Sequence, residues 1–145
     1  MLAGIEELTL ANVMVWHYRN TMGPAPKRDY KRTWQAILHL RGRDAAALDC
    51  PVLTELEDVQ DINAPDGRHG DRHYTWQNTR QKPDELAERL VRHCTAAAGA
   101  LVVDPFAGSG SFLLAAARLG RRALGCDSSE ETLRIAITRG CGRAD

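Results

Sequence analysis

The stretch Leu101-Val-Val-Asp-Pro-Phe-Ala-Gly-Ser-Gly-Ser-Phe112 sets the architecture of this 145-residue chain. It begins as a short apolar run that ends in Asp104, and it then passes through Gly108 and Gly110 into an alanine-rich amphipathic segment. This order predicts a β-strand, a tight glycine turn and an α-helix, which together open a nucleotide-type site in a doubly wound α/β sheet. The other segments can be placed relative to this site.

Three classes of ligand use such a glycine turn, because the backbone can approach the ligand and the next helix presents free N–H groups. A phosphate-binding loop needs a lysine after the second glycine, and Ser111-Phe-Leu113 supplies none. A dinucleotide loop needs a third glycine where Leu113 stands. The third class is S-adenosylmethionine, whose carboxylate suits the helix N-terminus. Asp104 suits its ammonium group or an ordered water, and could otherwise be a solvated turn residue.

A second expected strand, Arg122-Ala-Leu-Gly-Cys-Asp127, ends in an acid 23 residues after Asp104. An acid about 20 residues on, at the tip of the second strand, accepts hydrogen bonds from ribose hydroxyls. Asp127 fits that role. The alternative is an N-cap of the next helix, a position that Ser128 or Ser129 could also occupy.

Asp104-Pro-Phe-Ala-Gly-Ser-Gly-Ser111 resembles the cofactor loop of DNA amino-methyltransferases, which methylate N6 of adenine or N4 of cytosine. Gln81-Lys-Pro83, with Leu86 and Arg89-Leu-Val91, resembles the segment just upstream of that loop in the permuted members, whose catalytic half comes first. The resemblance covers about residues 12–139 and is strongest over 76–127. It implies S-adenosylmethionine as cofactor, bound by Asp104, Pro105, Phe106, Ala107, Gly108, Ser109, Gly110 and Asp127. Lys82 could reach the cofactor carboxylate or could be a surface lysine.

The resemblance also implies the fold class, which is α/β: a partial Rossmann-like methyltransferase sheet with an antiparallel β-hairpin as one flank. We expect a single partial domain over residues 1–145. Its parts are a basic β-hairpin at 12–41, an irregular segment at 42–75 and a cofactor-binding half at 76–145. In the irregular segment only Asp44–Leu48 suggests a short helical turn.

Local patterns predict the elements of these parts. The residues from Asn12 to Tyr18 and from Trp34 to Leu40 are expected to form the two strands of the hairpin. Pro83 is well placed at the first turn of a helix. Expected inner faces of the three helices are Leu86 and Leu90, then Phe112, Leu113, Ala116 and Leu119, then Leu133, Ala136 and Ile137, with Gly120 and Gly140 ending the last two.

The net charge of zero hides an uneven distribution. Residues 19–43 carry a net charge of +6, whereas residues 44–66 hold seven acids and no Lys or Arg. The basic stretch suits double-stranded DNA, although it could be a merely solvated face, and the acidic one is expected to face away from DNA. Expected DNA contacts are Arg19, Asn20, Lys27, Arg28, Lys31 and Arg32.

Composition excludes several other classes. The sequence has no apolar stretch of 18 residues and no secretion signal at its start. Its four cysteines share no metal-like spacing, which favours reduced thiols in a cytoplasmic protein. His69 and His73 lie four residues apart without a helical pattern, so no metal site is expected. No membrane partner is expected either, because a long apolar stretch is missing.

The tetrapeptide on which the family's chemistry depends is missing. It reads Asp/Asn/Ser-Pro-Pro-Tyr/Phe/Trp, binds the target amino group and stacks on the flipped base. The sequence has no Pro-Pro, and only eleven residues precede position 12, where the permuted order would place the tetrapeptide upstream. We therefore assign no catalytic residue and expect a truncated chain whose central strands are missing, or a split enzyme whose second chain supplies them.

The resulting hypothesis is a fragment of a site-specific DNA methyltransferase of the restriction–modification type, which transfers a methyl group from S-adenosylmethionine to an exocyclic amino group of adenine or cytosine. The alternative is a non-catalytic cofactor- or DNA-binding subunit of a split or degenerate methyltransferase. An RNA or small-molecule methyltransferase would explain the glycine loop but neither the segment at Lys82 nor the basic hairpin. Leu113 disfavours a nicotinamide dehydrogenase, and the target base stays open.

Overall fold

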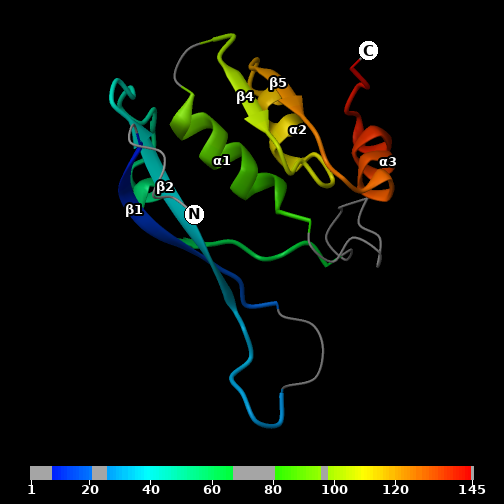
Figure 1. The fold of residues 1–145 in the computed structure, drawn as a ribbon. Coiled ribbons are helices and arrows are strands. Elements are labelled where there is room, and N and C mark those ends of the chain that lie inside the picture. Colours follow the sequence, from blue (N-terminus) through cyan, green and yellow to red (C-terminus); the bar gives the residue numbers. More distant parts are fainter. Residues whose placement is uncertain (1–7, 21–25, 67–80, 96–97, 145) are drawn as a thin grey trace.

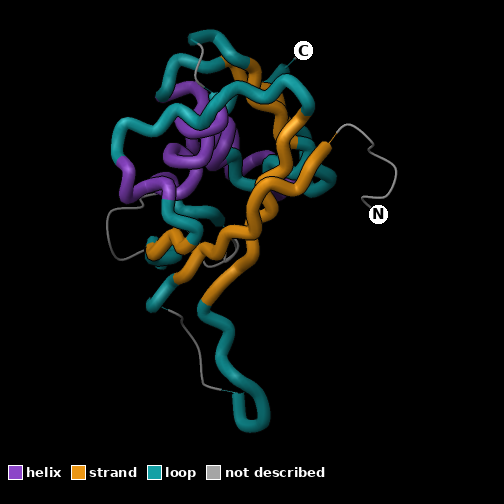
Figure 2. The backbone as a smooth tube through the Cα atoms, turned by 90° about the vertical axis from the view of Figure 1, so that its left-hand side faces the viewer, coloured by secondary structure: helices purple, strands orange, loops and turns teal. Residues whose placement is uncertain are grey.

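The computed structural model describes residues 8–20, 26–66, 81–95 and 98–144. These residues form two small sheets and three α-helices (Figure 1). One sheet has three strands in the order β2-β1-β3, and the other pairs β4 with β5. The helices gather beside the second sheet, whereas the strands of the first lead away to a long loop (Figure 2).

The hairpin predicted from β-branched and aromatic residues is present. Strand β1 (Leu8–His17) pairs with β2 (Trp34–Gly42) in antiparallel register, with an irregularity between Leu10 and Asn12. The first strand begins four residues earlier than expected, because pairing with the far end of β2 extends the ladder beyond the aromatic run.

A third strand is a correction to the expectation that residues 42–75 hold no regular element. Strand β3 (Val59–Asp61) pairs in parallel with β1, and a 3-10 helix, η1 (Leu53–Leu56), precedes it. The helical turn expected at 44–48 is wrong, since only a tight turn at 43–44 is present there. A three-residue strand is too short to have a detectable period, and it is held by the free edge of β1 and by long-range hydrogen bonds.

Gln60 shows how β3 is held. Its side chain is 1% exposed, and its amide nitrogen donates to the backbone oxygens of Glu55 (3.0 Å) and Glu57 (2.6 Å). Its amide oxygen accepts from Arg89 (2.8 Å). A buried polar side chain with all these partners fixes η1 and β3 against the helix that carries Arg89.

The cofactor-binding half follows the predicted order. Helix α1 (Asp84–Cys94) starts directly after Pro83, and strand β4 (Leu101–Asp104) leads through the glycine turn into α2 (Ser111–Arg118). Strand β5 (Arg122–Gly125) pairs in parallel with β4, and α3 (Glu130–Arg139) closes the chain. Both predicted glycine ends are confirmed, because Gly120 has φ +70° and Gly140 has φ +117°.

Helix α1 joins the two halves, and it lies between the hairpin and the β4–β5 pair (Figure 1). Ala87 and Val91 pack against α2 in one core cluster, together with Ala115 and Ala116. Leu86 packs in a second cluster with Trp16 of β1 and with Ile62, which directly follows β3. Adjacent i, i+4 stripes of one helix therefore serve two separate cores.

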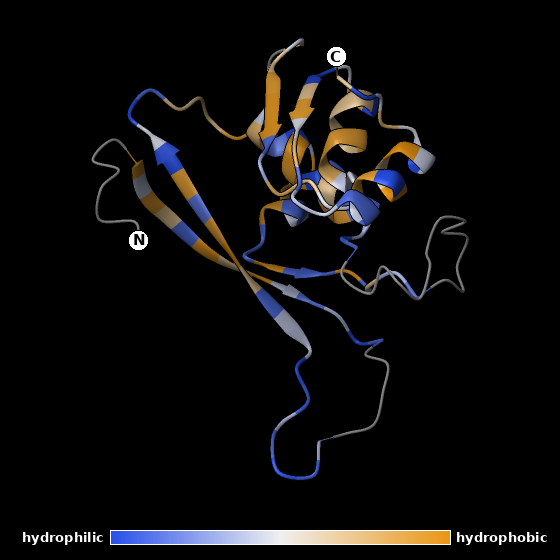
Figure 3. Cartoon of the chain, turned by 45° about the vertical axis from the view of Figure 1, so that its right-hand side comes forward, coloured by the Kyte–Doolittle hydropathy of each residue, from blue (hydrophilic) through white to orange (hydrophobic). Residues whose placement is uncertain are grey.

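Several apolar side chains of the strands face solvent. Leu101, Val103 and Leu124 are each half exposed or more on the β4–β5 pair, whose strands carry hydrophobic colouring over much of their length in Figure 3. Ile137 is 48% exposed, so its expected place in the core is wrong: α3 buries only Ala136 fully. No strand of one sheet pairs with the other among the described residues.

In the described part of the chain, no helix combines the length and the apolar character that a membrane crossing requires.

Candidate cofactor site

The glycine turn lies where β4 and β5 end side by side. The backbone N–H of Phe106 donates to Oδ1 of Asp104 (3.0 Å), and the N–H of Ala107 donates to the carbonyl of Cys126 at the end of β5 (2.9 Å). These bonds hold the turn over the carboxyl ends of both parallel strands. In open α/β sheets this edge is the place where ligands bind.

The two glycines of the turn have different physical roles. Gly108 has φ +52°, and a Cβ built there would meet only the carbonyl oxygen of Phe106, at 3.9 Å. Gly110 has φ +77°, and a Cβ there would lie 2.6 Å from Sγ of Cys141 and 3.2 Å from Cβ of Ala136. Gly108 thus leaves an open approach for a ligand, whereas Gly110 lets the turn pack against α3.

Asp127 is engaged by the protein itself. Its Oδ2 accepts from the N–H of Gly108 (2.8 Å), and its Oδ1 accepts from the N–H of Ser129 (2.9 Å) and the hydroxyl of Thr132 (3.1 Å). The N–H groups of Ser129 and Gly108 lower the pKa of this carboxyl group below its ordinary value. Ser129 is the N-cap of α3, so Asp127 braces both the helix start and the glycine turn.

The segment before α1 meets the start of α2. The hydroxyl of Ser111 donates to the backbone carbonyl of Lys82 (2.9 Å), which brings together two stretches that are 29 residues apart. The Lys82 ammonium lies 5.8 Å from the centre of the Trp16 ring, a cation–π contact. Lys82 therefore lies at the junction of the hairpin, α1 and the glycine turn.

Exposure divides the other predicted cofactor residues into two groups. Phe106 is 85% exposed and stands out from the turn. Ala107 (8% exposed) and Ser109 (6%) are buried, so they act through the shape of the backbone. Pro105 is exposed beside Phe106. The turn thus offers one free aromatic side chain above an otherwise packed backbone.

Arg139, at the end of α3, is the residue of this region that the sequence did not single out. Its side chain is 2% exposed, and its guanidinium contacts Ser109, Ser111 and Asp84. From sequence alone it matches a basic residue in the last turn of a helix, which complements the helix dipole. No local signal reveals a contact between residues 28 to 55 positions apart.

The basic hairpin loop projects from the body of the molecule (Figure 1). Lys27, Arg28 and Arg32 are exposed and Lys31 is half-buried. Arg19 forms an ion pair with Asp61 (2.5 Å), so one residue of the acidic segment lies against the end of β1, where the basic loop begins. Asn20 exchanges two hydrogen bonds with the backbone of Ala64 (2.6 and 2.9 Å), which anchors the base of the loop.

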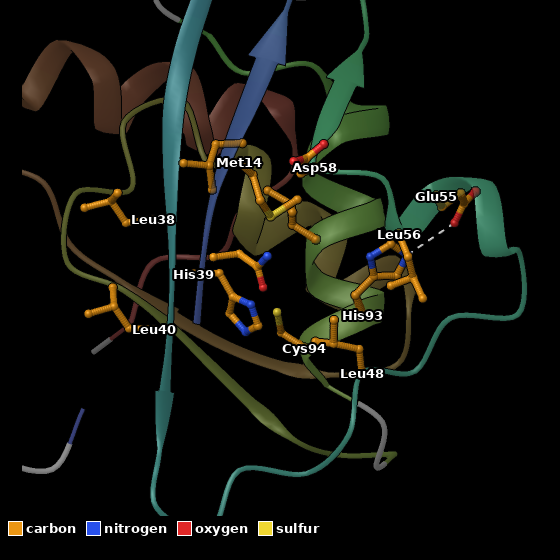
Figure 4. Close-up of a pocket in the computed structure, with 13 residues that line it drawn as sticks. Met14, Leu38, His39, Leu40, Leu48, Glu55, Leu56, Asp58, His93 and Cys94 are labelled. Atoms are coloured by element: carbon orange, nitrogen blue, oxygen red, sulfur yellow. Dashed lines mark hydrogen bonds and ion pairs between the residues drawn. The ribbon is translucent and has the colours of Figure 1, made fainter. Parts of the chain in front are cut away.

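A separate pocket of about 330 Å³ lies between the hairpin and α1, away from the glycine turn (Figure 4). Its lining includes Met14, Leu38, Leu56 and Cys94, and it contains none of the predicted site residues. Its lining is mainly apolar, with a few polar side chains such as His39, Asp58 and His93.

At one side of this pocket, possible metal-binding atoms of Cys50, Glu55 and His93 lie within 4.8 Å of one another. Glu55 also forms an ion pair with Arg92. Burial would raise the pKa of the Glu55 carboxyl group, but hydrogen bonds from His93 and Arg92 outweigh it and hold the pKa below its ordinary value. The Arg92 guanidinium thus already neutralises the carboxylate that a metal would need. His69 and His73 lie outside the described residues.

Comparisons with known proteins agree with this geometry. The chain is 31% identical over 143 residues to the type II methyltransferase M2.DpnII of Streptococcus pneumoniae, covering 92% of this chain and 52% of that protein. It is 28% identical, with the same coverage, to the type II methyltransferase M2.LlaDCHI of Lactococcus lactis subsp. cremoris. The chain thus spans about half the length of the curated relatives it matches.

Solved structures show the same fold. The PvuII DNA methyltransferase (cytosine-N4-specific) superposes with a TM-score of 0.74 at 18% identity, covering 98% of this chain and 54% of that one. The M1.HpyAVI–SAM complex has a TM-score of 0.72 at 24% identity, with coverages of 92% and 63%. The family model described as DNA methylase, for N6 and N4 methyltransferases, matches residues 1–138. This chain belongs to that family of N6/N4 DNA methylases.

Proposed function

We propose that this chain is the cofactor-holding and DNA-contacting part of a DNA amino-methyltransferase. It binds S-adenosylmethionine at the glycine turn and contributes to methyl transfer onto an exocyclic amino group of adenine or cytosine in double-stranded DNA. The observation that carries the proposal is the turn itself: open space beside Gly108 and the exposed Phe106 stand at the N-terminus of α2, over the ends of β4 and β5. Family membership adds the reaction class.

The cofactor would be held by this chain's own groups. The N-terminus of α2 attracts its carboxylate. The backbone carbonyl of Lys82 is bonded to Ser111 at this terminus, so we place the Lys82 ammonium, which lies over the Trp16 ring in the ligand-free structure, as a second positive charge for that carboxylate. Phe106 offers an aromatic face to the cofactor, and we place Asp104 near its ammonium group. Asp127 can still accept a hydrogen bond from a ribose hydroxyl, because each carboxylate oxygen accepts more than one bond. When bound, the cofactor supplies the reactive sulfonium methyl group.

Methyl transfer would need a surface that this chain does not provide by itself. The sequence has no Pro-Pro tetrapeptide to bind the target amino group. The exposed apolar face of Leu101, Val103 and Leu124 fits central strands and helices supplied by a further polypeptide segment. We propose that the tetrapeptide comes on that segment, either in a second chain or in a longer form of this one. A cytoplasmic location stays a prediction from the cysteines.

Cofactor binding is tested by calorimetry with S-adenosylhomocysteine, with NADH as the control ligand. We expect saturable binding of the first and none of the second. Phe106→Ala should weaken binding without changing the melting temperature, because its side chain is 85% exposed. Tyr30→Ala is the matched control, since that ring is fully exposed on the hairpin loop. Absence of binding by the unaltered chain would contradict the proposal.

Transfer is tested with radiolabelled S-adenosylmethionine and duplex DNA. We expect no transfer by the chain alone, and transfer when a polypeptide with the Pro-Pro tetrapeptide and the central strands is added. Cofactor binding without transfer in both mixtures would favour the non-catalytic subunit, the second candidate, which the missing tetrapeptide supports. Transfer by the chain alone would remove the need for a further segment.

A further inference from the structure

Arg139 carries an unusual combination of burial and polar contacts. One guanidinium nitrogen donates to the backbone carbonyl of Ser109 (2.7 Å), to its hydroxyl (3.2 Å) and to the hydroxyl of Ser111 (3.0 Å). The other nitrogen donates to a carboxylate oxygen of Asp84 (2.6 Å). With the side chain 2% exposed, these are charge-assisted bonds shielded from water.

The partners of Arg139 are the two segments that the proposed cofactor site needs. Ser109 and Ser111 belong to the glycine turn and the first residue of α2, and Asp84 is the first residue of α1. The Ser111 hydroxyl, which accepts from Arg139, donates in turn to the carbonyl of Lys82. The Arg139 guanidinium thus connects the glycine turn directly, and the Lys82 segment through the Ser111 hydroxyl.

A lysine or an apolar residue could not reproduce this arrangement. The planar fork of arginine presents several N–H groups at fixed angles, whereas a lysine ammonium is a single point charge. Asp84 also accepts from Arg118 (2.9 Å), so its carboxylate keeps a partner when Arg139 is changed. Loss of Arg139 would therefore make the glycine turn more mobile, whereas the start of α1 would stay held by Arg118.

We propose that Arg139 is the positioning residue of the cofactor site: it holds the Ser109–Ser111 turn and the Lys82 segment in the geometry that the ligand requires. This inference rests on the proposed binding of S-adenosylmethionine. Arg139 does not touch the ligand. It acts through the backbone of the turn, because its contacts with Ser109 and Ser111 fix the N-terminus of α2.

The test compares Arg139→Lys with Arg134→Lys, a matched change five residues earlier in α3. Arg134 is 74% exposed and makes only an i, i+4 pair with Glu130. We expect the dissociation constant for S-adenosylhomocysteine to rise about tenfold or more in the first variant, the order expected when a charge-assisted hydrogen bond is removed, and to stay unchanged in the second. Equal affinities of Arg139→Lys and the unaltered chain would overturn the proposal.

Two further variants separate positioning from stability. Ser111→Ala breaks the link to Lys82 and keeps the ion pair, so it should weaken binding and add little to Arg139→Lys in the double variant. Asp84→Asn weakens the ion pair with Arg139 but keeps the bonds from Arg139 to Ser109 and Ser111. It should therefore lower the melting temperature and leave the dissociation constant for S-adenosylhomocysteine nearly unchanged. Full additivity of Ser111→Ala and Arg139→Lys would contradict a shared role.

Hydrogen exchange of the ligand-free chain distinguishes this inference from the proposed function. We expect faster exchange of the Gly108 and Gly110 amides in Arg139→Lys than in Arg134→Lys, whether or not ligand binds. If the unaltered chain binds no S-adenosylhomocysteine, the proposed function fails, but this measurement still tests whether Arg139 holds the glycine turn. Unchanged exchange in both amides would overturn the positioning role itself.

Discussion

The glycine-turn half and the hairpin half of this molecule are built differently. The first, over 81–95 and 98–144, braces its turn with Asp127, Ser111 and Arg139, all bonded within the same half. The second, over 8–20 and 26–66, has a three-stranded sheet with exposed apolar side chains such as Val13 and Leu38, and a projecting basic loop. The first half has a turn fixed by internal hydrogen bonds, whereas the second exposes apolar and basic side chains to solvent.

Under the proposed function, this contrast would divide cofactor binding and DNA contact between the two halves. Hydrogen bonds from buried side chains fix the geometry of a small-ligand site, because each unmet bond there would be costly. A surface that binds DNA phosphates depends mainly on exposed Lys and Arg side chains, and it does not need them in one fixed arrangement. Helix α1 is the only α-helix, among those described, that supplies residues to both core clusters, so the two halves meet through it.

The largest effect is expected at that junction. Leu86 is 2% exposed between Trp16 and Ile62, so Leu86→Ala should lower the free energy of unfolding by about 3 kcal/mol, because the side chain's packing is removed and a cavity remains. Chemical denaturation followed by tryptophan fluorescence measures it. Leu53→Ala, at an 81% exposed leucine, is the control and should change little. Equal effects of both variants would mean that the halves do not depend on this contact.

The next effect separates backbone strain from packing in the glycine turn. Gly110 and Gly99 have almost the same φ, +77° and +76°, but only Gly110 has atoms close to a built Cβ. Gly99→Ala should cost about 1 to 2 kcal/mol from the left-handed backbone alone. Gly110→Ala should cost about 1 kcal/mol more, since Cys141 and Ala136 must shift to relieve the clash. Thermal melting of both variants measures this, and equal losses would contradict the packing role of Gly110.

A smaller effect tests the hairpin loop. Replacing Lys27 and Arg28 by alanine should weaken duplex DNA binding and reduce the slope of its salt dependence by about one for each phosphate that is no longer neutralised. Fluorescence anisotropy over a salt series measures both. The control replaces Arg41 and Arg43, exposed basic residues at the opposite end of β2. If the control weakens binding as much as the loop variant, a diffuse charge and not the loop binds DNA.

The smallest effect is pH-dependent. Since the folded pKa of Asp127 lies below the ordinary value of 3.8, its stabilising contribution is fully present above that value and is lost as pH falls through the folded pKa. Asp127→Asn should therefore be less stable than the unaltered chain at neutral pH, and the difference should shrink in acid. Melting temperatures from pH 7 to pH 3 measure it, with the exposed Asp44→Asn as control. If the difference in melting temperature between Asp127→Asn and the unaltered chain grows in acid, the pKa of Asp127 is not lowered in the folded state.

Much of the cofactor half could be predicted because its signals are local. The apolar run before Asp104, the glycines with positive φ and Pro83 before α1 each act within a few residues. The hairpin was predictable for the same reason, from two runs of strand-forming residues. Strand β3 was not, because three residues have no period and depend on the edge of β1.

The strand–turn–helix order, the family resemblance and the uneven charge all followed from the sequence, since each is a property of neighbouring residues. The folded chain was needed to show that Asp127 braces Gly108, that Gly110 is required against Cys141, and that Arg139 ties two distant segments together. The hydrogen bonds among these contacts join residues 19 to 55 positions apart. Packing of α3 against the turn creates them, and no local pattern encodes that packing.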